Sequence, residues 1–379
     1  MPCQGHKGEP MNRSPIFVVV VLAWGLAGQV FAGPCDGIDF DTVIFREDFT
    51  GPDGSLPDSD WVIGHPEDTS GWHLQGRTFF PTPSQHPTAP FPHLQDNACV
   101  ITHYNYNPYE KITPEHPKKE TFLGGELHTD LKFEPTQCYR FEARVRWPQA
   151  PRGLVTSFFT YGYDEPNKDS DEIDFEYLSN EVFDLSRQVL TNTWDDSQQK
   201  PVQVVMPDAF DLTEWQTFRF YWCPDTCVKW TWIDPGTGNE VTLRMEDISH
   251  FPDEAMSLYF NFWAADALWE KAYDANLEAD QEDNEVKYEY FIDYAEVRIP
   301  EPLPGDANLD GTTNALDYVV VSNHYNIGST WTEGDVNGDG AVNALDYVVI
   351  SNNYGAHAPE PATLALLGLG GLLLGRNRR

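Results

Sequence analysis

The sequence Asp171-Glu172-Ile173-Asp174-Phe175-Glu176-Tyr177 alternates acidic with apolar residues. Successive side chains of a β-strand point to opposite faces, so this alternation predicts a strand. Glu172, Asp174 and Glu176 would lie on one face, and the apolar residues between them would pack on the other. The stretch therefore indicates a strand that carries a row of carboxylates on one face and core residues on the other.

Segments on both sides of this stretch have the same period. Residues 140–147 and 218–222 alternate polar with apolar side chains, and turn sequences such as residues 234–238 separate the candidate strands at short intervals. The chain is 13% aromatic and holds 28 Gly and 29 Pro, which favours strands and turns over helices. We expect an all-β domain, a jelly-roll sandwich of two stacked sheets, one of which can curve into an open cleft for an extended polymer.

The charge balance excludes one class of partner. The 379 residues include 60 Asp plus Glu against 24 Lys plus Arg, a formal net charge of −36. Nucleic-acid binding needs clustered Lys and Arg to contact phosphates, so we expect no nucleic-acid partner. The 12 Trp supply more core-forming surface than a disordered chain carries.

The N-terminal segment is predicted to be a secretory signal covering residues 1–32. It has a charged start at Arg13, an apolar run over residues 16–27, and the small-residue cleavage pattern Val30-Phe31-Ala32 before Gly33. Met11 is an alternative start that would place the apolar run at the usual distance from the terminus. The protein is therefore expected to be exported.

The C-terminal segment has three parts: Pro359-Glu360-Pro361, an apolar stretch over residues 362–375, and the basic residues Arg376, Arg378 and Arg379. The apolar stretch is shorter than the roughly 20 residues that span a bilayer. Residues 357–379 resemble the PEP-CTERM sorting signal of Gram-negative bacteria. That resemblance implies processing by a membrane exosortase and a secreted or cell-surface location. A short hydrophobic anchor is the alternative.

The cysteines fit an oxidising compartment. Cys3 lies in the segment expected to be removed, which leaves Cys35, Cys99, Cys138, Cys223 and Cys227. The last two flank a turn between two aromatic strands, which predicts a short hairpin disulfide, while the pairing of the others stays open. No second cysteine pair or nearby His accompanies them, which argues against zinc.

An internal repeat follows at a spacing of 29 residues. Residues 306–317 and 335–346 both place oxygen side chains at loop positions 1, 3, 5, 9 and 12, glycine at position 6 and a backbone carbonyl at position 7, which is a calcium-loop pattern. Apolar residues at helical spacing follow each loop. The predicted ligands to two Ca²⁺ are Asp306, Asn308, Asp310, Thr312, Asn314 and Asp317, and Asp335, Asn337, Asp339, Ala341, Asn343 and Asp346.

One helix per loop distinguishes this repeat from a calmodulin-like hand. Residues 306–355 closely resemble a type I dockerin, joined to the preceding domain by a linker over residues 300–305. The resemblance implies a cohesin-like partner, contacted through residues just after the ninth loop position. These residues are Ala315, Leu316, Ala344 and Leu345.

The carboxylate row at residues 172–176 has three interpretations. Like charges repel, and no basic residue occurs between Asp169 and Ser186, so the row faces water, binds a cation or shares protons for catalysis. The outer two α-carbons lie about 13 Å apart on a strand. Inward-leaning Glu side chains can still approach the roughly 5 to 5.5 Å that a retaining glycosidase requires.

The motif resembles the signature of glycoside hydrolase family 16, and in particular its lichenases and xyloglucan endotransglycosylases, since it has no inserted residue before the last Glu. Further similarities extend over most of residues 45–298 and assign the catalytic domain to residues 33–299. The resemblance implies a concanavalin A-like jelly roll. The matching segments are residues 125–126, 157–161, 190–194, 261–263 and 265–269.

The resemblance also implies roles for individual residues. Glu172 would be the nucleophile, Glu176 the general acid and then base, and Asp174 the carboxylate that tunes both. Ser170 departs from the lichenases, which have Trp there, so strict mixed-linkage specificity does not follow.

The resemblance also suggests residues that contact the sugar. Candidates for stacking on sugar rings are Tyr161, Trp194, Trp263 and Trp269, and candidates for binding hydroxyls are Glu126, Asn192 and Asn261. For each of them, packing in the core is an equal alternative. His103, His116, His128 and His250 show no metal spacing and are predicted to lie on the surface.

These features together predict a secreted, retaining endo-β-glycanase, an O-glycosyl hydrolase that needs no catalytic cofactor and acts on a neutral β-glucan with β-1,4 links. Three alternatives stay open: a transglycosylase on a xyloglucan-like glucan, a hydrolase of algal galactan, and a non-catalytic carbohydrate-binding surface protein.

Overall fold

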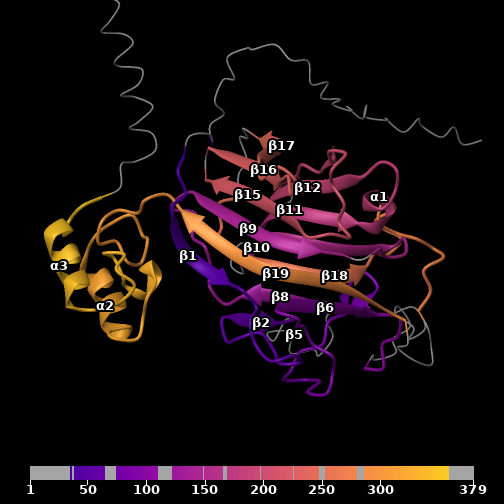
Figure 1. Ribbon diagram of the computed structural model, residues 1–379, viewed down its shortest axis with the longest axis horizontal. Helices are drawn as coiled ribbons and strands as arrows, with labels where there is room; N and C mark the ends of the chain where they lie inside the picture. Colours follow the sequence, from indigo (N-terminus) through magenta and orange to yellow (C-terminus); the bar gives the residue numbers. More distant parts are fainter. Residues whose placement is uncertain are drawn as a thin grey trace, which may run out of the picture. The chain divides into compact units, whose positions relative to one another are not determined.

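The computed structural model describes residues 35, 38–64, 74–109, 122–147, 149–164, 169–196, 198–224, 226–246, 252–279 and 286–357 (Figure 1). The expected signal segment and almost all of the sorting segment lie outside these residues. Within them, no helix is both long and apolar enough to cross a membrane.

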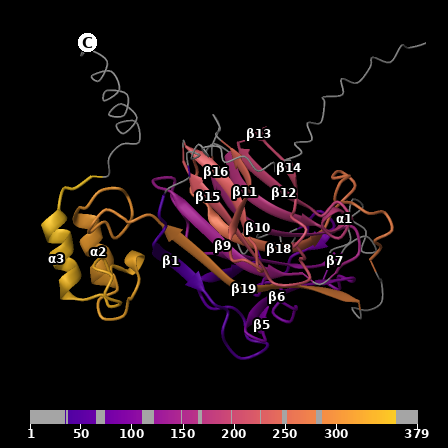
Figure 2. The same ribbon diagram turned by 45° about the horizontal axis from the view of Figure 1, so that its top comes forward.

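The larger part of the chain forms two β-sheets, seen in Figure 1 and, after a turn, in Figure 2. Among the described residues, eleven strands form one sheet: β1 (Thr42–Glu47), β3 (Leu74–Gln75), β4 (Thr78–Phe79), β5 (His93–Gln95), β6 (Ala98–Tyr104), β7 (Phe122–Leu123), β9 (Tyr139–Arg146), β15 (Gln216–Cys223), β16 (Cys227–Ile233), β17 (Glu240–Glu246) and β19 (Lys287–Ile299). Eight form the other: β2 (Trp61–Ile63), β8 (Gly125–Thr129), β10 (Leu154–Asp164), β11 (Asp169–Leu178), β12 (Gln188–Asp195), β13 (Gln198–Gln199), β14 (Val202–Val205) and β18 (Ser257–Ala264).

The order of the strands places β11 inside the eight-stranded sheet, which runs β13-β12-β11-β10-β18-β8-β2. The larger sheet runs β17-β16-β15-β9-β19-β6-β7-β4-β3. In the described part of the chain, the strand pairs are antiparallel except for β4 with β7, which is parallel. The all-β sandwich expected from the alternating segments is therefore confirmed.

Aromatic side chains fill the space between the sheets. Phe158 of β10 stacks on Phe260 of β18 (centroids 5.4 Å apart) and packs against Phe220 of the larger sheet (5.0 Å). The Trp230 indole, also from the larger sheet, donates a hydrogen bond to the backbone oxygen of Asp174 (2.9 Å). Phe175 is fully buried. The predicted apolar face of β11 thus lies in the core, which turns the carboxylate face outward.

A short helix, α1 (Ser179–Val182), follows β11 directly and ties the neighbouring loops together. The Asn180 side chain accepts a hydrogen bond from the Gly153 N–H (2.8 Å) and donates to the backbone oxygens of Lys271 (2.7 Å) and Tyr273 (3.1 Å). One buried amide therefore holds the end of β11, the start of β10 and the loop after β18 in a common arrangement.

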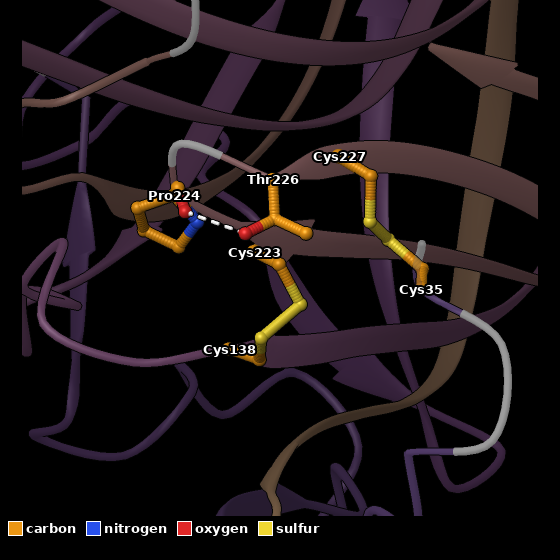
Figure 3. Close-up of a disulfide and its surroundings, with 6 residues drawn as sticks. All are labelled: Cys35, Cys138, Cys223, Pro224, Thr226 and Cys227. Atoms are coloured by element: carbon orange, nitrogen blue, oxygen red, sulfur yellow. Dashed lines mark hydrogen bonds between the residues drawn. A yellow bond between two sulfur atoms is a disulfide. The ribbon is translucent and has the colours of Figure 1, made fainter. Parts of the chain in front are cut away.

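The hairpin disulfide predicted between Cys223 and Cys227 is wrong. These residues are direct cross-strand partners on β15 and β16, but Cys227 is bonded to Cys35, and Cys223 is bonded to Cys138 (Figure 3). Cys138 immediately precedes β9, which pairs with the other edge of β15, so its α-carbon lies 4.1 Å from that of Cys223. Each cysteine of the hairpin is therefore bonded to a cysteine that is distant in sequence but close in space. Cys99 is a buried free thiol.

The surface location predicted for the histidines is wrong for His103, which is 1% exposed. Its ring packs between Phe122 (5.1 Å) and Phe262 (5.3 Å), and burial lowers its pKa to about 3. The reason is that β6 lies inside its sheet, between β19 and β7, and is buried along nearly its whole length. His116 and His250 lie outside the described residues, and His128 is half-buried.

The repeat region forms two loop–helix units, with α2 (Ala315–Asn323) after the first loop, η2 (Trp331–Glu333) between the units, and α3 (Ala344–Asn353) after the second loop. Asn314 and Asn343, at the ninth loop positions, cap the two helices by accepting hydrogen bonds from the N–H groups of Leu316 and Leu345, each 2.8 Å long. The expectation of one helix per loop is confirmed.

Candidate active site

The three carboxylates of β11 lie in the middle of the eight-stranded sheet. β11 pairs with β10 and β12 without a register shift, so each carboxylate has a defined neighbour on either side. The neighbours on β10 and β12 are Tyr161 and Trp194 for Glu172, Phe159 and Asn192 for Asp174, and Ser157 and Leu190 for Glu176.

The protonation of these carboxylates differs because their surroundings differ. Burial, together with the charge of Glu172, raises the pKa of Glu176 to about 8. Burial raises the pKa of Glu172 to about 7, but a hydrogen bond with Asp174 opposes the rise. Burial between two acidic neighbours raises the pKa of Asp174 well above its usual range. At neutral pH Glu176 therefore holds its proton more fully than Glu172 does.

In the direction across the strands, Glu176 is in line with two further predicted site residues. Ser157 on β10 is opposite Asn261 on β18, which is opposite Glu126 on β8. The Asn261 amide donates a 3.4 Å hydrogen bond to Glu126 Oε2, and both side chains are buried. Four strands thus bring Glu126 and Asn261 into line with Glu176.

The predicted stacking aromatics separate into two groups. Tyr161 and Trp194 flank Glu172 on either side and are half-buried. Trp263 is 6% exposed and packs in an apolar cluster with Leu178 and Leu190, beyond Glu176. Trp269 stacks on it with centroids 5.6 Å apart and is itself half-buried. Core packing therefore accounts for Trp263, while the other three rings keep exposed surface.

An aromatic row that was not predicted from the sequence continues across the sheet from Asp174. Its members are Phe159, Tyr259 on β18 and His128 on β8, which are consecutive partners in register. The His128 ring stacks on Tyr259 (4.5 Å between centroids, planes 18° apart), and Tyr259 packs on Phe159 (5.1 Å). Two-residue spacing from Tyr161, Asn261 and Glu126 was the signal that could have found them.

Asp171, the first residue of the motif, has a structural role. It is buried on the face opposite the carboxylate row and accepts hydrogen bonds from the N–H groups of Asp253 (2.6 Å) and Glu254 (2.8 Å). These contacts hold the loop before β18 against the start of β11. Asp171 therefore supports the strand rather than joining the row.

The two repeat loops fold around their first and last carboxylates. Asp306 accepts hydrogen bonds from the N–H groups of Asp310 (3.1 Å) and Gly311 (2.8 Å), and Asp335 does the same in the second loop. Asp317 is buried, and burial raises the pKa of Asp306 to about 6, with the nearby Asp317 and Asp310 adding to the rise. The carboxylate oxygens converge in each loop, and their mutual repulsion disfavours the ionised form. A hard cation such as Ca²⁺ would offset this repulsion, so the donor set fits the expected ion.

Residues 103–292, half of the chain, match the model for glycosyl hydrolases family 16. The chain belongs to this family. It is therefore an O-glycosyl hydrolase of the endo-β-glycanase kind. Residues 304–355 match the dockerin type I domain, and residues 357–379 match the PEP-CTERM protein-sorting motif. Dockerin type I domains typically bind calcium.

Solved structures of similar fold include glucanases. A prokaryotic β-1,3-1,4-glucanase (lichenase) derived from a mouse hindgut metagenome is 20% identical, with 68% of this chain and 98% of that chain covered and a TM-score of 0.46. The catalytic domain of an endo-1,3-β-glucanase (laminarinase) from Thermotoga petrophila RKU-1 is 15% identical, with coverage of 69% and 99% and a TM-score of 0.49. No curated protein sequence matches the chain.

Proposed function

We propose that this family 16 enzyme is a secreted, retaining endo-β-glycanase that hydrolyses a neutral β-glucan. The observation that carries the proposal is the carboxylate row on one face of β11, where the pKa of Glu176 is raised to about 8 and a hydrogen bond with Asp174 opposes the rise at Glu172. A protonated acid and an ionised nucleophile on one strand face are what a double displacement requires.

In the first step Glu172 attacks the anomeric carbon while Glu176 gives its proton to the glycosidic oxygen. The carbon–oxygen bond breaks, the leaving sugar departs with the proton, and a glycosyl ester forms on Glu172. In the second step the Glu176 carboxylate takes a proton from water, whose oxygen attacks the same carbon and releases Glu172. Two inversions give net retention.

Residues beside the row supply sugar contacts in this proposal. Tyr161 and Trp194 offer ring faces on either side of Glu172, and Trp269 offers one beyond Glu176. The Asn261 Oδ1 atom is buried and has no hydrogen-bond partner among the described residues, so a sugar hydroxyl that donates to it would satisfy it. Glu126, hydrogen-bonded to Asn261, presents a second acceptor nearby.

Two features favour a neutral glucan: the acidic residues near the start of β11, and the uninterrupted pairing of β11. Acidic residues gather near the start of β11, where desolvation raises the pKa of Asp169 and the charges of Asp196, Asp164 and Asp253 add to the rise. A polyanion such as sulfated galactan would be repelled there. The uninterrupted pairing of β11 agrees with a motif that has no inserted residue before its last Glu, as in the lichenases and xyloglucan endotransglycosylases that it resembles.

Proton NMR of the first product from mixed-linkage glucan or xyloglucan tests this mechanism, since retention is expected and inversion would contradict it. Glu172→Ala should lose activity by a factor of about a thousand or more and recover part of it with azide, as an inverted glycosyl azide. Larger products in the presence of xyloglucan oligosaccharides would point to transglycosylation. A clear preference for agarose, porphyran or carrageenan would reject the substrate class while leaving the mechanism.

For the remaining segments we propose a signal at residues 1–32, the catalytic domain at 33–299, a linker at 300–305, the calcium module at 306–355 and a sorting signal at 357–379 for exosortase processing at the envelope of a Gram-negative bacterium. Two Ca²⁺ would bind the loops and neutralise their carboxylates. Leu316 and Leu345 are 57% and 58% exposed, and Val319 and Val348 are both 51% exposed. These repeat-related apolar pairs support a cohesin-like partner.

A further inference from the structure

Asn192 lies opposite Asp174 on the neighbouring strand β12, on the face that carries the carboxylate row. Both side chains are almost completely buried, at 4% and 2% exposed. The sequence predicts Asn192 to be either a ligand for a sugar hydroxyl or a core residue. Its position beside the middle carboxylate suggests a different role.

The orientation of the Asn192 amide is set by the chain that follows β12. After β12 the chain turns back through β13, and the backbone N–H of Lys200 donates to Asn192 Oδ1 (3.1 Å) as well as to the Thr193 oxygen (3.0 Å). A backbone N–H can only donate, so the end of the amide that faces Lys200 must be the oxygen. The NH₂ end is thereby left to face the carboxylate row.

We propose that Asn192 is a positioning residue that acts on the nucleophile Glu172 through Asp174, with the Lys200 N–H holding its amide in the required orientation. This inference rests on the proposed function and deepens it. In this proposal the NH₂ group of Asn192, which lies opposite Asp174, donates to the Asp174 carboxyl, and Asp174 in turn shares a proton with Glu172. The chain of contacts runs from a backbone N–H on the hairpin to the attacking oxygen.

The electrostatic effect follows from the neighbours of Asp174. Burial and the charges of Glu172 and Glu176 raise the pKa of Asp174, while the hydrogen bond from Asn192 opposes this rise. A donor at Asp174 therefore stabilises the single negative charge that the Glu172–Asp174 pair carries. Without it the pair should take up its second proton at a higher pH.

Other titratable groups lie around the pair. Tyr161 on β10, Tyr259 on β18, and Glu126 and His128 on β8 share this face of the sheet, and the charge of Glu126 raises the pKa of Glu172. Arg244 on β17 lies within range of Asp174 from the core side, but its guanidinium contacts Glu246 and the Thr191 backbone oxygen. None of them is held against Asp174 by a backbone contact as Asn192 is.

The test measures kcat and KM against pH for hydrolysis of a neutral β-glucan by the full chain. Asn192→Ala should move the acidic limb of kcat/KM up by about half to one pH unit and leave the basic limb, set by Glu176, in place. At a pH below the limb, kcat should fall up to about tenfold while KM changes little. A raised KM with an unmoved acidic limb would make Asn192 a sugar ligand alone and overturn the inference.

A second variant leaves Asn192 in place. Lys200→Pro removes the N–H that orients the amide, and should move the acidic limb in the same direction by a smaller amount. Gln199→Ala, which changes an exposed side chain of the same hairpin, is the matched control and should keep the limb. Asn261→Ala should raise KM without moving the limb, because its amide contacts Glu126 and not Asp174.

The outcomes separate the two proposals. An unmoved acidic limb in both Asn192→Ala and Lys200→Pro would overturn the positioning role and leave the double displacement intact. Full activity in Glu172→Ala would instead overturn the assignment of the nucleophile on which the positioning role depends.

Discussion

Glu172 and Glu176 are identical side chains four residues apart, and their neighbours give them different chemistry. Burial raises the pKa of both, but a hydrogen bond with Asp174 opposes the rise at Glu172, whereas the charge of Glu172 adds to the rise at Glu176. Asp174, buried between them, is the residue that makes the two ends of the row unequal. The division into nucleophile and acid is thus a property of the surroundings of each carboxyl group.

The raised pKa of Glu176 predicts how activity and stability depend on pH. Activity should be lost as the pH rises through about 8, because Glu176 then gives up the proton that the leaving group needs. A carboxyl group whose folded-state pKa is raised binds more protons in the folded than in the unfolded state. Its contribution should therefore make the free energy of unfolding fall as the pH rises from about 4.3, the unfolded value, to about 8.

Thermal unfolding of wild type and Glu176→Gln between pH 4 and 9 checks this prediction. The variant lacks the titrating group, so its midpoint should fall less than that of wild type across this range. Equal slopes in both proteins would show that Glu176 does not carry the raised pKa. The Arg187→Gln variant, which changes a residue outside the carboxylate row, is the control for general charge effects.

At the scale of elements, the pairing of strands decides which residues meet. β9, β15 and β16 are adjacent in the larger sheet, and their ends bring together four cysteines that are spread over nearly 200 residues of sequence. The same effect aligns Glu126, Asn261 and Glu176 across the smaller sheet. Both clusters depend on register, since a shift of one residue would move every side chain to the opposite face.

The cysteine pairing can be checked by peptide mapping without reduction. Cleavage before Asp225 separates Cys223 from Cys227, so the two bonds can be read independently. We expect one linked pair of peptides that contains Cys35 and Cys227 and another that contains Cys138 and Cys223. A link between Cys223 and Cys227 would contradict the structure. Cys138→Ser should lower the free energy of unfolding by about 2 to 5 kcal/mol.

At the scale of the whole molecule, two kinds of fold depend on different forces. The sandwich is held by a continuous aromatic core and two disulfides, whereas the repeat region has a small core of Ala307, Val321, Val336, Val342 and Ile350. Its loops also concentrate carboxylates, which repel one another unless a cation is bound. The repeat region should therefore depend on calcium far more than the catalytic domain does.

Calorimetry of the full chain with and without a chelator tests this dependence. Two transitions are expected, and only the one assigned to residues 306–355 should move to lower temperature when calcium is removed. Hydrolysis of glucan should change little, because the predicted ligands lie outside the catalytic domain. Asp317→Ala with Asp346→Ala should mimic the chelator. A single transition that ignores chelator in both proteins would contradict the two-calcium proposal.

The sequence by itself determined the features that depend on short spacing. Alternation identified β11 and its two faces, and the 29-residue repeat identified the two loops with their helices, because period and turn chemistry act over a few residues. Only the tertiary structure decided which strands are neighbours. It rejected the Cys223–Cys227 pairing, buried His103 and most of Trp263, and placed Asn192 between Lys200 and Asp174. The physical reason is that spacing along the chain sets which face a side chain takes, whereas its partner is set by non-local strand pairing and by the packing of two sheets.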